Sequence, residues 1–463
     1  MDRTLNREIL RLSVPSILAN LTVPLVGLVD TAVAGHLPSQ LIPGSSLAGA
    51  AAFIGAISVG SMLFNLLYWN FSFLRTGTGG LTAQSFGRRD MAACGGILIR
   101  GLGLSLALSI LAIALRTPFV GMVLGLMQGS EGVELLARDY FFIRIWAAPA
   151  TLSLMAFSGW FVGMQDSMSS MWKDLVVNGV NIVASIFLSL GAGDWEGFGF
   201  RGIALGTVAA QYSGLLFCIL VCIFKYRRKV FDTIDSSRLK TLFRAGELRA
   251  FFKMNADLLI RSVFFTTIYI GFTVISARYG DMVLASGSLM MQILMIFSYF
   301  TDGFAYAGEA LSGRFIGAGD SCMLRRTVRY TFAWSLAMSG VFIFVYQALG
   351  TQILGLLTSD SVVVEFCRQF LPWLALMPPL GCAAFTWDGI YLGATASRGI
   401  RDAMAAASAA FFGIWFAGSF LLGGSASPQA RLHLLLGAYF AHLLARTLLL
   451  SFRYKKDILI KTQ

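Results

Sequence analysis

Residues 80–90 read Gly80-Leu-Thr-Ala-Gln-Ser-Phe-Gly-Arg-Arg-Asp90, and residues 310–320 read Ala310-Leu-Ser-Gly-Arg-Phe-Ile-Gly-Ala-Gly-Asp320. The two stretches lie 320 − 90 = 230 residues apart. The same offset aligns Gly159-Trp-Phe-Val-Gly163 with Gly389-Ile-Tyr-Leu-Gly393, and Pro149 with Pro379. Separate matches at a single offset predict that the chain contains two copies of one structural unit.

The composition indicates that these units lie in a membrane. The 463 residues are 56% hydrophobic and 13% charged, with a mean hydropathy of +0.72, whereas soluble domains carry about 25% charged residues. A spanning helix needs about 20 predominantly apolar residues. Runs of this kind predict twelve spans, beginning near Ile9, Ser46, Gly96, Tyr140, Trp172, Gly202, Met254, Val283, Val328, Val362, Met404 and Leu432.

The basic residues are concentrated on one predicted side of the membrane. Although the net charge is +12, the placement of that charge argues against nucleic acid as a partner. The clusters lie before the first span or after even-numbered spans, so the positive-inside rule predicts that both termini are cytoplasmic. These clusters are Arg3/Arg7/Arg11, Arg88/Arg89, the segment Lys225–Lys253, Arg325/Arg326/Arg329, Arg398/Arg401 and Arg453/Lys455/Lys456.

The repeat and the spans together predict an all-α polytopic membrane protein. About twelve transmembrane helices would form two six-helix lobes related by pseudo-two-fold symmetry along the membrane normal. We expect an N-lobe at residues 1–224 (spans 1–6), a basic cytoplasmic linker at 225–253 and a C-lobe at 254–463 (spans 7–12). Parallel halves of this kind are typical of transporters, with the substrate path between them. The alternative, a duplicated scaffold without transport, leaves the buried charges without a role.

Asp30 is the most informative of those charges. It lies in the first long apolar run, Leu25–Ala34, where a charge costs at least about 2.5–3.5 kcal/mol. No basic residue is evident at its depth. The charged residues near span ends, which include Arg100, Arg138, Asp139 and Arg144, are expected to be interfacial. Burial favours a protonated carboxyl, so we expect Asp30 to take up and release a proton.

Polar residues and prolines near Asp30 complete the predicted coupling site. Asn178 and Asn181 in the fifth span and Thr207 in the sixth can supply hydrogen bonds, although buried polar residues also serve simply to pack helices. Pro15 and Pro24 fall within the first span, where proline tends to kink a helix, so we expect them to act as a hinge.

The second half carries more buried charges. Asp257 and Arg261 stand four residues apart, a spacing that lets them pair on one helix face. Asp302 and Glu309 share one stripe of the eighth span, and Asp388 lies in the tenth. We expect Arg261 to meet Asp302 or Asp388. A static ion-pair network and direct cation binding both account for this set, and the sequence leaves the choice open.

The sequence predicts no metal, no cofactor and no enzyme active site. Six cysteines are scattered through or beside the spans, and none of the three histidines has metal-ligand spacing with another His or Cys. A membrane transferase would need an Asp-rich metal-diphosphate motif or a His/Asp pair at a membrane face, and neither is present.

The chain resembles the MATE (multidrug and toxic compound extrusion) transporters, most closely their DinF-like branch. The resemblance covers nearly all spans and implies two lobes around a V-shaped cavity, with alternating access. It also implies efflux of amphipathic, often cationic compounds driven by inward H⁺ or Na⁺. The motifs that carry it are Val23-Pro-Leu-Val-Gly-Leu-Val-Asp-Thr-Ala-Val-Ala-Gly-His36, Phe73-Leu-Arg-Thr-Gly-Thr-Gly-Gly-Leu-Thr-Ala-Gln84, Asn181-Ile-Val, Asp257-Leu-Leu-Ile-Arg261, Asp302-Gly-Phe-Ala-Tyr-Ala-Gly-Glu309 and Trp387-Asp-Gly-Ile-Tyr-Leu-Gly-Ala394.

The resemblance also implies roles for single residues. Asp30 matches the proton-coupling aspartate of the family's first helix, and Asn181 matches an asparagine of the same N-lobe site. Ser185 stands where relatives often have a second aspartate. Asp388 matches an aspartate used for cation binding in the sodium-driven branch, but that branch's glutamate of the seventh span is replaced near Arg261. We therefore expect H⁺ as the coupling ion, with Na⁺ as the alternative.

The function expected from the sequence is a proton-coupled efflux antiporter, monomeric, in a bacterial inner membrane. Its partners would be small organic substrates, the coupling cation and membrane lipid. A sodium-coupled exporter of the same fold is one alternative. A lipid-linked oligosaccharide flippase is another, but such a protein would line its cavity with several basic residues for pyrophosphate, and the sequence offers chiefly Arg261.

Overall fold

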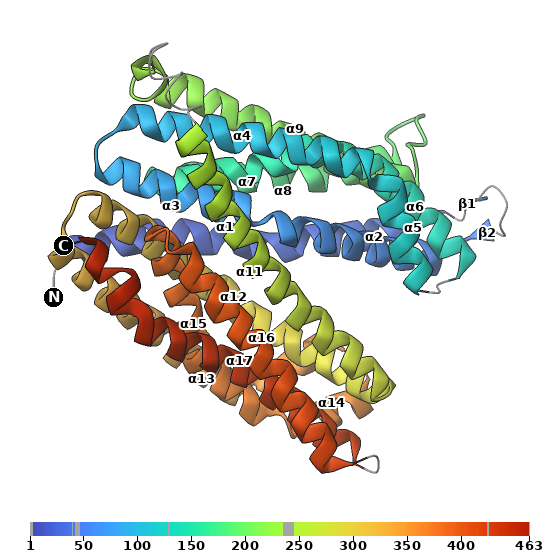
Figure 1. The fold of residues 1–463 in the computed structure, drawn as a ribbon. Coiled ribbons are helices and arrows are strands. Elements are labelled where there is room, and N and C mark those ends of the chain that lie inside the picture. The colour runs from blue at the N-terminus through green and yellow to red at the C-terminus, as the bar shows by residue number, and fades with distance from the viewer. Residues whose placement is uncertain are drawn as a thin grey trace.

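The computed structural model describes residues 3–38, 40–41, 47–127, 130–234, 245–358, 360–423 and 426–462, and nearly all of them are helical (Figure 1). The first half comprises α1 (Arg3–His36), β1 (Gln40–Leu41), β2 (Leu47–Ala48), α2 (Ala50–Phe71), α3 (Phe73–Gly87), α4 (Met91–Ala114), α5 (Arg116–Met127), α6 (Glu131–Arg144), η1 (Ile145–Ala147), α7 (Ala148–Gly163), α8 (Ser167–Leu190), α9 (Phe200–Val221), η2 (Cys222–Tyr226) and η3 (Phe231–Thr233). The second half comprises α11 (Ala245–Arg278), α12 (Asp281–Gly317), α13 (Ser321–Leu357), α14 (Ser361–Arg368), α15 (Leu371–Gly393), α16 (Ser397–Leu422), α17 (Pro428–Asp457) and η4 (Leu459–Thr462). The antiparallel pair β1–β2 is only two residues long on each side, so the fold is all-α as predicted.

The predicted spans are confirmed. In the described part of the chain, 11 helical segments are long and apolar enough to cross a membrane, and the bent pair α14–α15 makes 12. The two helices of that pair meet at 61°, because Pro372 in the first turn of α15 has no N–H with which to continue the helix before it. Large apolar side chains point outward, as expected in lipid: Leu356 is 86% exposed and Phe420 is 83% exposed.

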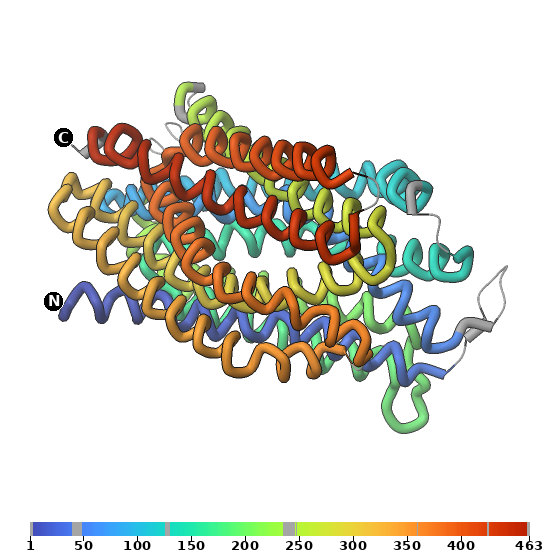
Figure 2. Tube along the Cα trace, turned by 90° about the horizontal axis from the view of Figure 1, so that it is seen from below, coloured from blue at the N-terminus to red at the C-terminus, as the bar shows by residue number. Residues whose placement is uncertain are grey.

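The helices form two lobes, α1–α9 and α11–α17 (Figure 1). The lobes lie close together at the end that carries both termini and diverge toward the other end (Figure 1). Figure 2 shows from below that both termini lie at the same end. Helix α1 packs on α8 of its own lobe and on α12 of the other. The predicted linker is partly helical, since α11 already begins at Ala245. Its residues 235–244, which include Arg238, Lys240 and Arg244, lie outside the described residues, and so does Ser46.

Matching positions of the two halves play matching structural roles. The carboxylates of Asp90 and Asp320 cap α4 and α13, each accepting from the backbone N–H three residues later, at 3.0 and 2.9 Å. Gln165 and Thr395 are also related by the offset, since 395 − 165 = 230. Both have left-handed backbones, with φ of 61° and 50°, and each lies two residues before the first residue of its helix, α8 or α16. The internal repeat is therefore a repeat of structure as well as of sequence.

The same offset governs how the lobes touch. A Cβ atom added at Gly87 of α3 would lie 2.0 Å from the carbonyl oxygen of Arg314 in α12, and one at Gly317 would lie 2.0 Å from the carbonyl oxygen of Gln84. The two contacts are equivalent, because 87 + 230 = 317 and 84 + 230 = 314. Only glycine permits this approach. The repeated glycine of the opening motif thus brings α3 and α12 into backbone contact across the pseudo-two-fold axis.

Candidate functional site

Asp30 points into the N-lobe, away from lipid. Asp30 is 5% exposed, whereas Leu25 and Leu28 on other faces of α1 are 50% and 66% exposed. The Oδ1 atom of Asp30 is buried and has no hydrogen-bond partner among the described residues. Buried polar atoms are nearly always bonded, so this oxygen marks a place where a proton or another small ligand can bind.

Helices α8 and α9 form the wall beside this carboxyl. Asn181 and Ser185 stand one turn apart on α8, and Asn181 Nδ2 donates to Thr207 Oγ1 of α9 at 3.1 Å. Gly206 makes this contact possible, because a Cβ there would lie 2.6 Å from the backbone nitrogen of Ser185. The Ser185 hydroxyl lies beside the Asp30 carboxyl but outside hydrogen-bond geometry. Asn181 Oδ1 and Ser185 Oγ are, like Asp30 Oδ1, buried without a partner among the described residues.

Asn178 serves a different contact. Its Nδ2 donates to Thr22 Oγ1 at 2.6 Å, and Thr22 precedes Asp30 by eight residues, or about 12 Å along a helix. Asn20 Nδ2, two residues earlier, donates to the carbonyl of Tyr299 in α12 at 3.1 Å. Asn178 therefore lies away from Asp30, where α1 passes from one lobe to the other.

The two prolines occupy different environments in α1. The helix is continuous from Arg3 to His36 through both of them. Pro15 is buried and Pro24 is exposed. Pro24 also falls between Asn20, which is bonded to the C-lobe, and Asp30, which is buried in the N-lobe.

A basic residue lies near Asp30 after all. Arg144 ends α6, and the break at η1 lets its side chain turn into the lobe, where NH1 donates to Tyr140 Oη at 2.8 Å. Its guanidinium carbon lies 4.6 Å from the ring centre of the buried Phe64. It is also close enough to interact electrostatically with Asp30. The expectations that Arg144 is interfacial and that no base lies at the depth of Asp30 are therefore wrong.

In the C-lobe, the partner of Arg261 is Asp388. Arg261 NH2 donates to Asp388 Oδ2, and Arg446 Nε of α17 lies 3.7 Å from Asp388 Oδ1. Asp302 makes no ion pair within the described residues, but it lies in the field of Arg75, Arg261 and Arg446. Of the two partners expected for Arg261, the structure selects the one in the tenth span.

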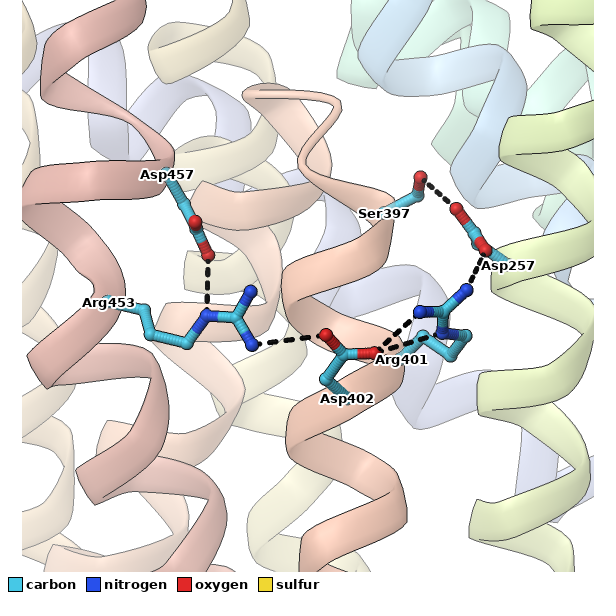
Figure 3. A network of polar contacts seen from close by, with 6 residues as sticks. All are labelled: Asp257, Ser397, Arg401, Asp402, Arg453 and Asp457. Atoms are coloured by element: carbon cyan, nitrogen blue, oxygen red, sulfur yellow. Dashed lines mark hydrogen bonds and ion pairs between the residues drawn. The ribbon is translucent and has the colours of Figure 1, made fainter.

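Asp257 and Arg261 do not pair with each other. Asp257 Oδ1 accepts from Arg401 NH1 of α16 at 2.6 Å, and its Oδ2 accepts from Ser397 Oγ at 3.0 Å (Figure 3). The spacing of four residues permits a pair on one helix, but a neighbouring helix offers Asp257 a better-placed guanidinium. Arg261 is correspondingly left to reach Asp388 on α15.

Glu309 forms an ion pair between the lobes. This side chain is fully buried, and its Oε2 lies 3.2 Å from NH1 of Arg75 in α3. Its Oε1 lies over Gly79, where an added Cβ would come within 2.1 Å of it. The Arg75 guanidinium also lies 4.3 Å from the ring centre of Tyr306. The absence of a side chain at Gly79 therefore gives the glutamate room to reach the other lobe.

Two arginines of this region were missed from the sequence. Arg446 is 1% exposed and interrupts the apolar run Leu443–Leu450, which is the same signal that singled out Asp30. Arg75 gives a weaker signal because it follows the break between α2 and α3 in a polar, glycine-rich stretch. Within the described residues, no three His, Cys, Asp or Glu side chains are grouped so that they could hold a metal ion.

Comparisons with known proteins agree with this architecture. The family described as MatE matches residues 15–187 and 258–398. DNA damage-inducible protein F of Escherichia coli K12 is 34% identical over 408 residues, which cover 88% of this chain and 84% of that protein. A probable multidrug resistance protein NorM of Photorhabdus laumondii is 23% identical over 421 residues, covering 89% and 86%.

The fold also matches solved structures. The outward-facing conformation of a multidrug resistance MATE family transporter of the MOP superfamily superposes with a TM-score of 0.81 at 16% identity, covering 99% of this chain and 97% of that one. A MATE structure in the bent conformation gives a TM-score of 0.79 at the same identity, covering 99% of each chain. The chain therefore belongs to the MATE family, and it is a membrane transporter rather than an enzyme.

Proposed function

We propose that this protein exports amphipathic, cationic organic compounds in exchange for protons. The observation that carries the proposal is Asp30, a buried carboxyl whose Oδ1 has no partner among the described residues and which lies on α1, a helix that packs on both lobes. A group that gains or loses a charge at this place can change how α1 packs. The NorM relative's name supports efflux of drugs.

Asp30 would act through its two protonation states. The carboxylate is attracted to the Arg144 guanidinium and can accept from the Ser185 hydroxyl. The protonated carboxyl loses the attraction to Arg144 and gains a donor, for which the unpartnered Asn181 Oδ1 is an acceptor on the same wall. Protonation would therefore shift α1 toward α8, with Pro24 as the flexible point between the Asp30 contact and the Asn20 bond to the C-lobe. This movement would reduce the space for substrate in the N-lobe.

A proton fits this site better than a sodium ion. Asp30 is the single carboxylate that the described residues bring to this site, since α8 presents the Ser185 hydroxyl where a second acid would be needed to hold a chelated cation. A proton needs only one acceptor oxygen and one hydrogen-bond partner. We propose H⁺ as the coupling ion on this ground, with a monomer in the lipid bilayer as the working unit.

The proposed location is a bacterial inner membrane with both termini in the cytoplasm. The basic clusters near the termini favour this orientation. The lobes diverge away from the termini (Figure 1), so in this orientation the structure opens to the outside. Such a state would release substrate and receive the incoming proton.

A lipid-linked oligosaccharide flippase is the second candidate. The expectation that Arg261 is the chief interior base is wrong, because Arg75, Arg144 and Arg446 are interior as well, and this favours an anionic substrate. However, Arg75, Arg261 and Arg446 face Asp302, Glu309 and Asp388, three positive charges against three negative ones. A cluster without net charge is poorly suited to a pyrophosphate, so drug efflux remains the better proposal.

The test uses purified protein in proteoliposomes, with a fluorescent organic cation as substrate and with pH and sodium gradients imposed separately. We expect a pH gradient alone to drive transport, and Asp30→Asn to abolish it while the protein elutes and melts normally. Asp139→Asn is the matched control, since that carboxylate is paired with Arg201 on the exposed surface. Undiminished exchange by Asp30→Asn, or transport driven only by sodium, contradicts the proposal. Scrambling of a diphosphate lipid without cation transport supports the flippase.

A further inference from the structure

A second site lies between the lobes, at the end that carries the termini. A cavity of about 730 Å³ is bounded by α3 and α4 of the N-lobe and by α11, α16 and α17 of the C-lobe. It is distinct from the surroundings of Asp30, which do not contribute to its lining. Its charged lining residues are six bases and two acids: Arg88, Arg100, Lys253, Arg398, Arg453 and Lys456, with Asp257 and Asp457.

Both acids of the lining are already neutralised. Asp257 accepts from Arg401 at 2.6 Å, and Asp457 accepts from Arg453 Nε at 3.1 Å (Figure 3). Asp402 lies between the two arginines and accepts from Arg401 at 2.7 Å and from Arg453 at 3.2 Å (Figure 3). The chain of alternating charges across α11, α16 and α17 is satisfied within itself. Neither acid is therefore available to balance the other bases of the cavity.

Four of those bases have no acidic partner among the described residues. Arg88, Lys253, Arg398 and Lys456 are exposed, and none of them forms an ion pair with another described residue. Within the described residues, the Arg88 guanidinium donates to the hydroxyl of Ser85, at 3.2 Å, and to no other group. Arg88 comes from the N-lobe and the other three from the C-lobe. Four like charges around one cavity repel one another, and an anion between them would turn this repulsion into attraction.

The uncharged part of the lining is mostly apolar, with Ser85, Thr395 and Ser397 as its polar members. Leu81 and Ile97 line the cavity from the N-lobe, and Phe251 and Met254 line it from the C-lobe. Ile97, Phe251 and Met254 are buried, with exposed fractions of 3%, 4% and 8%. A ligand that fits this lining is an anion joined to an apolar or uncharged body.

We propose that this cavity binds a phosphate group, carried either by an anionic membrane lipid or by a soluble phosphate ester. Guanidinium and ammonium groups are the usual ligands of phosphate in proteins, and their hydrogen bonds to it are charge-assisted. Basic pockets between transmembrane helices recognise phospholipid head groups in this manner. Because Arg88 and the three C-lobe cations belong to different lobes, the bound phosphate would bridge them. It would stabilise the arrangement in which the lobes are closed at the end with the termini.

Two variants test the site, each lacking three positive charges. The cavity variant is Arg88→Gln/Lys253→Gln/Lys456→Gln. The control variant is Arg89→Gln/Arg249→Gln/Lys455→Gln. These three residues are exposed and lie close in sequence to those of the cavity variant, but they do not line the cavity. Lipid binding is measured by native mass spectrometry of protein from nanodiscs containing phosphatidylglycerol or phosphatidylcholine. Soluble binding is measured as the rise in melting temperature with inorganic phosphate or glycerol 3-phosphate, against sodium chloride at equal ionic strength.

We expect affinity for at least one phosphate source to fall about tenfold or more in the cavity variant and to stay near the wild-type value in the control. If the wild type retains phosphatidylglycerol but is not stabilised by glycerol 3-phosphate, the phosphate belongs to a lipid head group. If glycerol 3-phosphate stabilises the wild type, the phosphate belongs to a soluble ester. Equal losses in the two variants overturn the proposal, since they would reflect only the general charge of this end of the protein. Absence of phosphate binding to the wild type overturns it as well. The single variant Lys253→Gln, at an exposed position, gives the same comparison if the triple variant fails to fold.

Discussion

Replacing Asp388 with asparagine should destabilise the C-lobe more than any surface charge substitution. Asp388 is 6% exposed, and its two oxygens face Arg261 and Arg446, whose side chains are 16% and 1% exposed. Asparagine keeps the size of the side chain but removes the negative charge. Two buried guanidinium groups would then share an amide in place of a carboxylate.

The size of the effect follows from this burial. Breaking a buried ion pair by removing one partner costs about 3–5 kcal/mol, because the other charge is left uncompensated. Asp139→Asn shows how much stability is lost when an exposed ion pair is broken, since the side chains of Arg201 and Asp139 are 66% and 36% exposed. Exposed pairs contribute only about 0–1 kcal/mol. The double variant Arg261→Gln/Asp388→Asn removes one charge of each sign and should recover part of the loss.

The assay also decides between the two roles left open for these charges. Free energies of unfolding in detergent are compared for wild type, Asp388→Asn, the double variant and Asp139→Asn, and exchange is measured in proteoliposomes. We expect a large loss of stability with exchange retained by the folded fraction, because a cation at Asp388 would have to displace two guanidinium groups. Stability equal to that of Asp139→Asn, together with loss of exchange, would refute the structural role and favour cation binding.

Three further predictions concern the ends of the spans and their packing. Gly317→Ala should lower the free energy of unfolding by about 1–3 kcal/mol, because the added methyl group overpacks α3 against α12. Gly340→Ala, on the open face of α13, is the control and should be neutral or stabilising. Thermal melts of both variants check this, and equal melting temperatures would contradict it. Burial alone would raise the pKa of Asp166, but hydrogen bonds, first that of Lys225, hold the pKa below its ordinary value. The Asp166 carboxylate therefore stabilises the protein above its unfolded pKa of about 3.9, and this contribution is lost as pH falls below that value; Asp166→Asn should flatten the acid side of the stability profile. Trp160→Phe should cost about 1–3 kcal/mol, because the buried indole N–H donates to the carbonyl of residue 94 at 2.8 Å; an unchanged free energy of unfolding would show that water replaces the bond.

The sequence predicts the fold because the fold is repeated in it. Twelve apolar runs and one offset of 230 residues specify the spans and their arrangement without any knowledge of contacts. The offset even relates Gly87 to Gly317, which pack reciprocally. What the pattern omits is how the lobes meet: nothing local to Arg75 reports that its partner is Glu309, 234 residues away.

Pairs of charges are predicted less well than spans, for a related reason. Spacing along one helix shows which pairs are possible, but the choice depends on what neighbouring helices present. Asp257 could reach Arg261 on its own helix, yet it forms its ion pair with Arg401 of α16. The position of Arg144 near a predicted span end favours an interfacial side chain, but the break after α6 turns it inward.

The repeat places the acids of the two lobes unequally. Subtracting 230 from Asp302, Glu309 and Asp388 leads to Ser72, Gly79 and Ser158, so the N-lobe has small residues wherever the C-lobe has these acids. The C-lobe acids face an equal number of arginines, and one of the arginines comes from the other lobe. Asp30 has no counterpart in that set, and its Oδ1 remains without a partner in the described structure. A carboxylate in direct contact with an arginine gains little from a proton, and Glu309 and Asp388 are of this kind. Asp30 is attracted to Arg144 but forms no ion pair with it in the described structure, so Asp30 is better placed than those two acids to take up a proton.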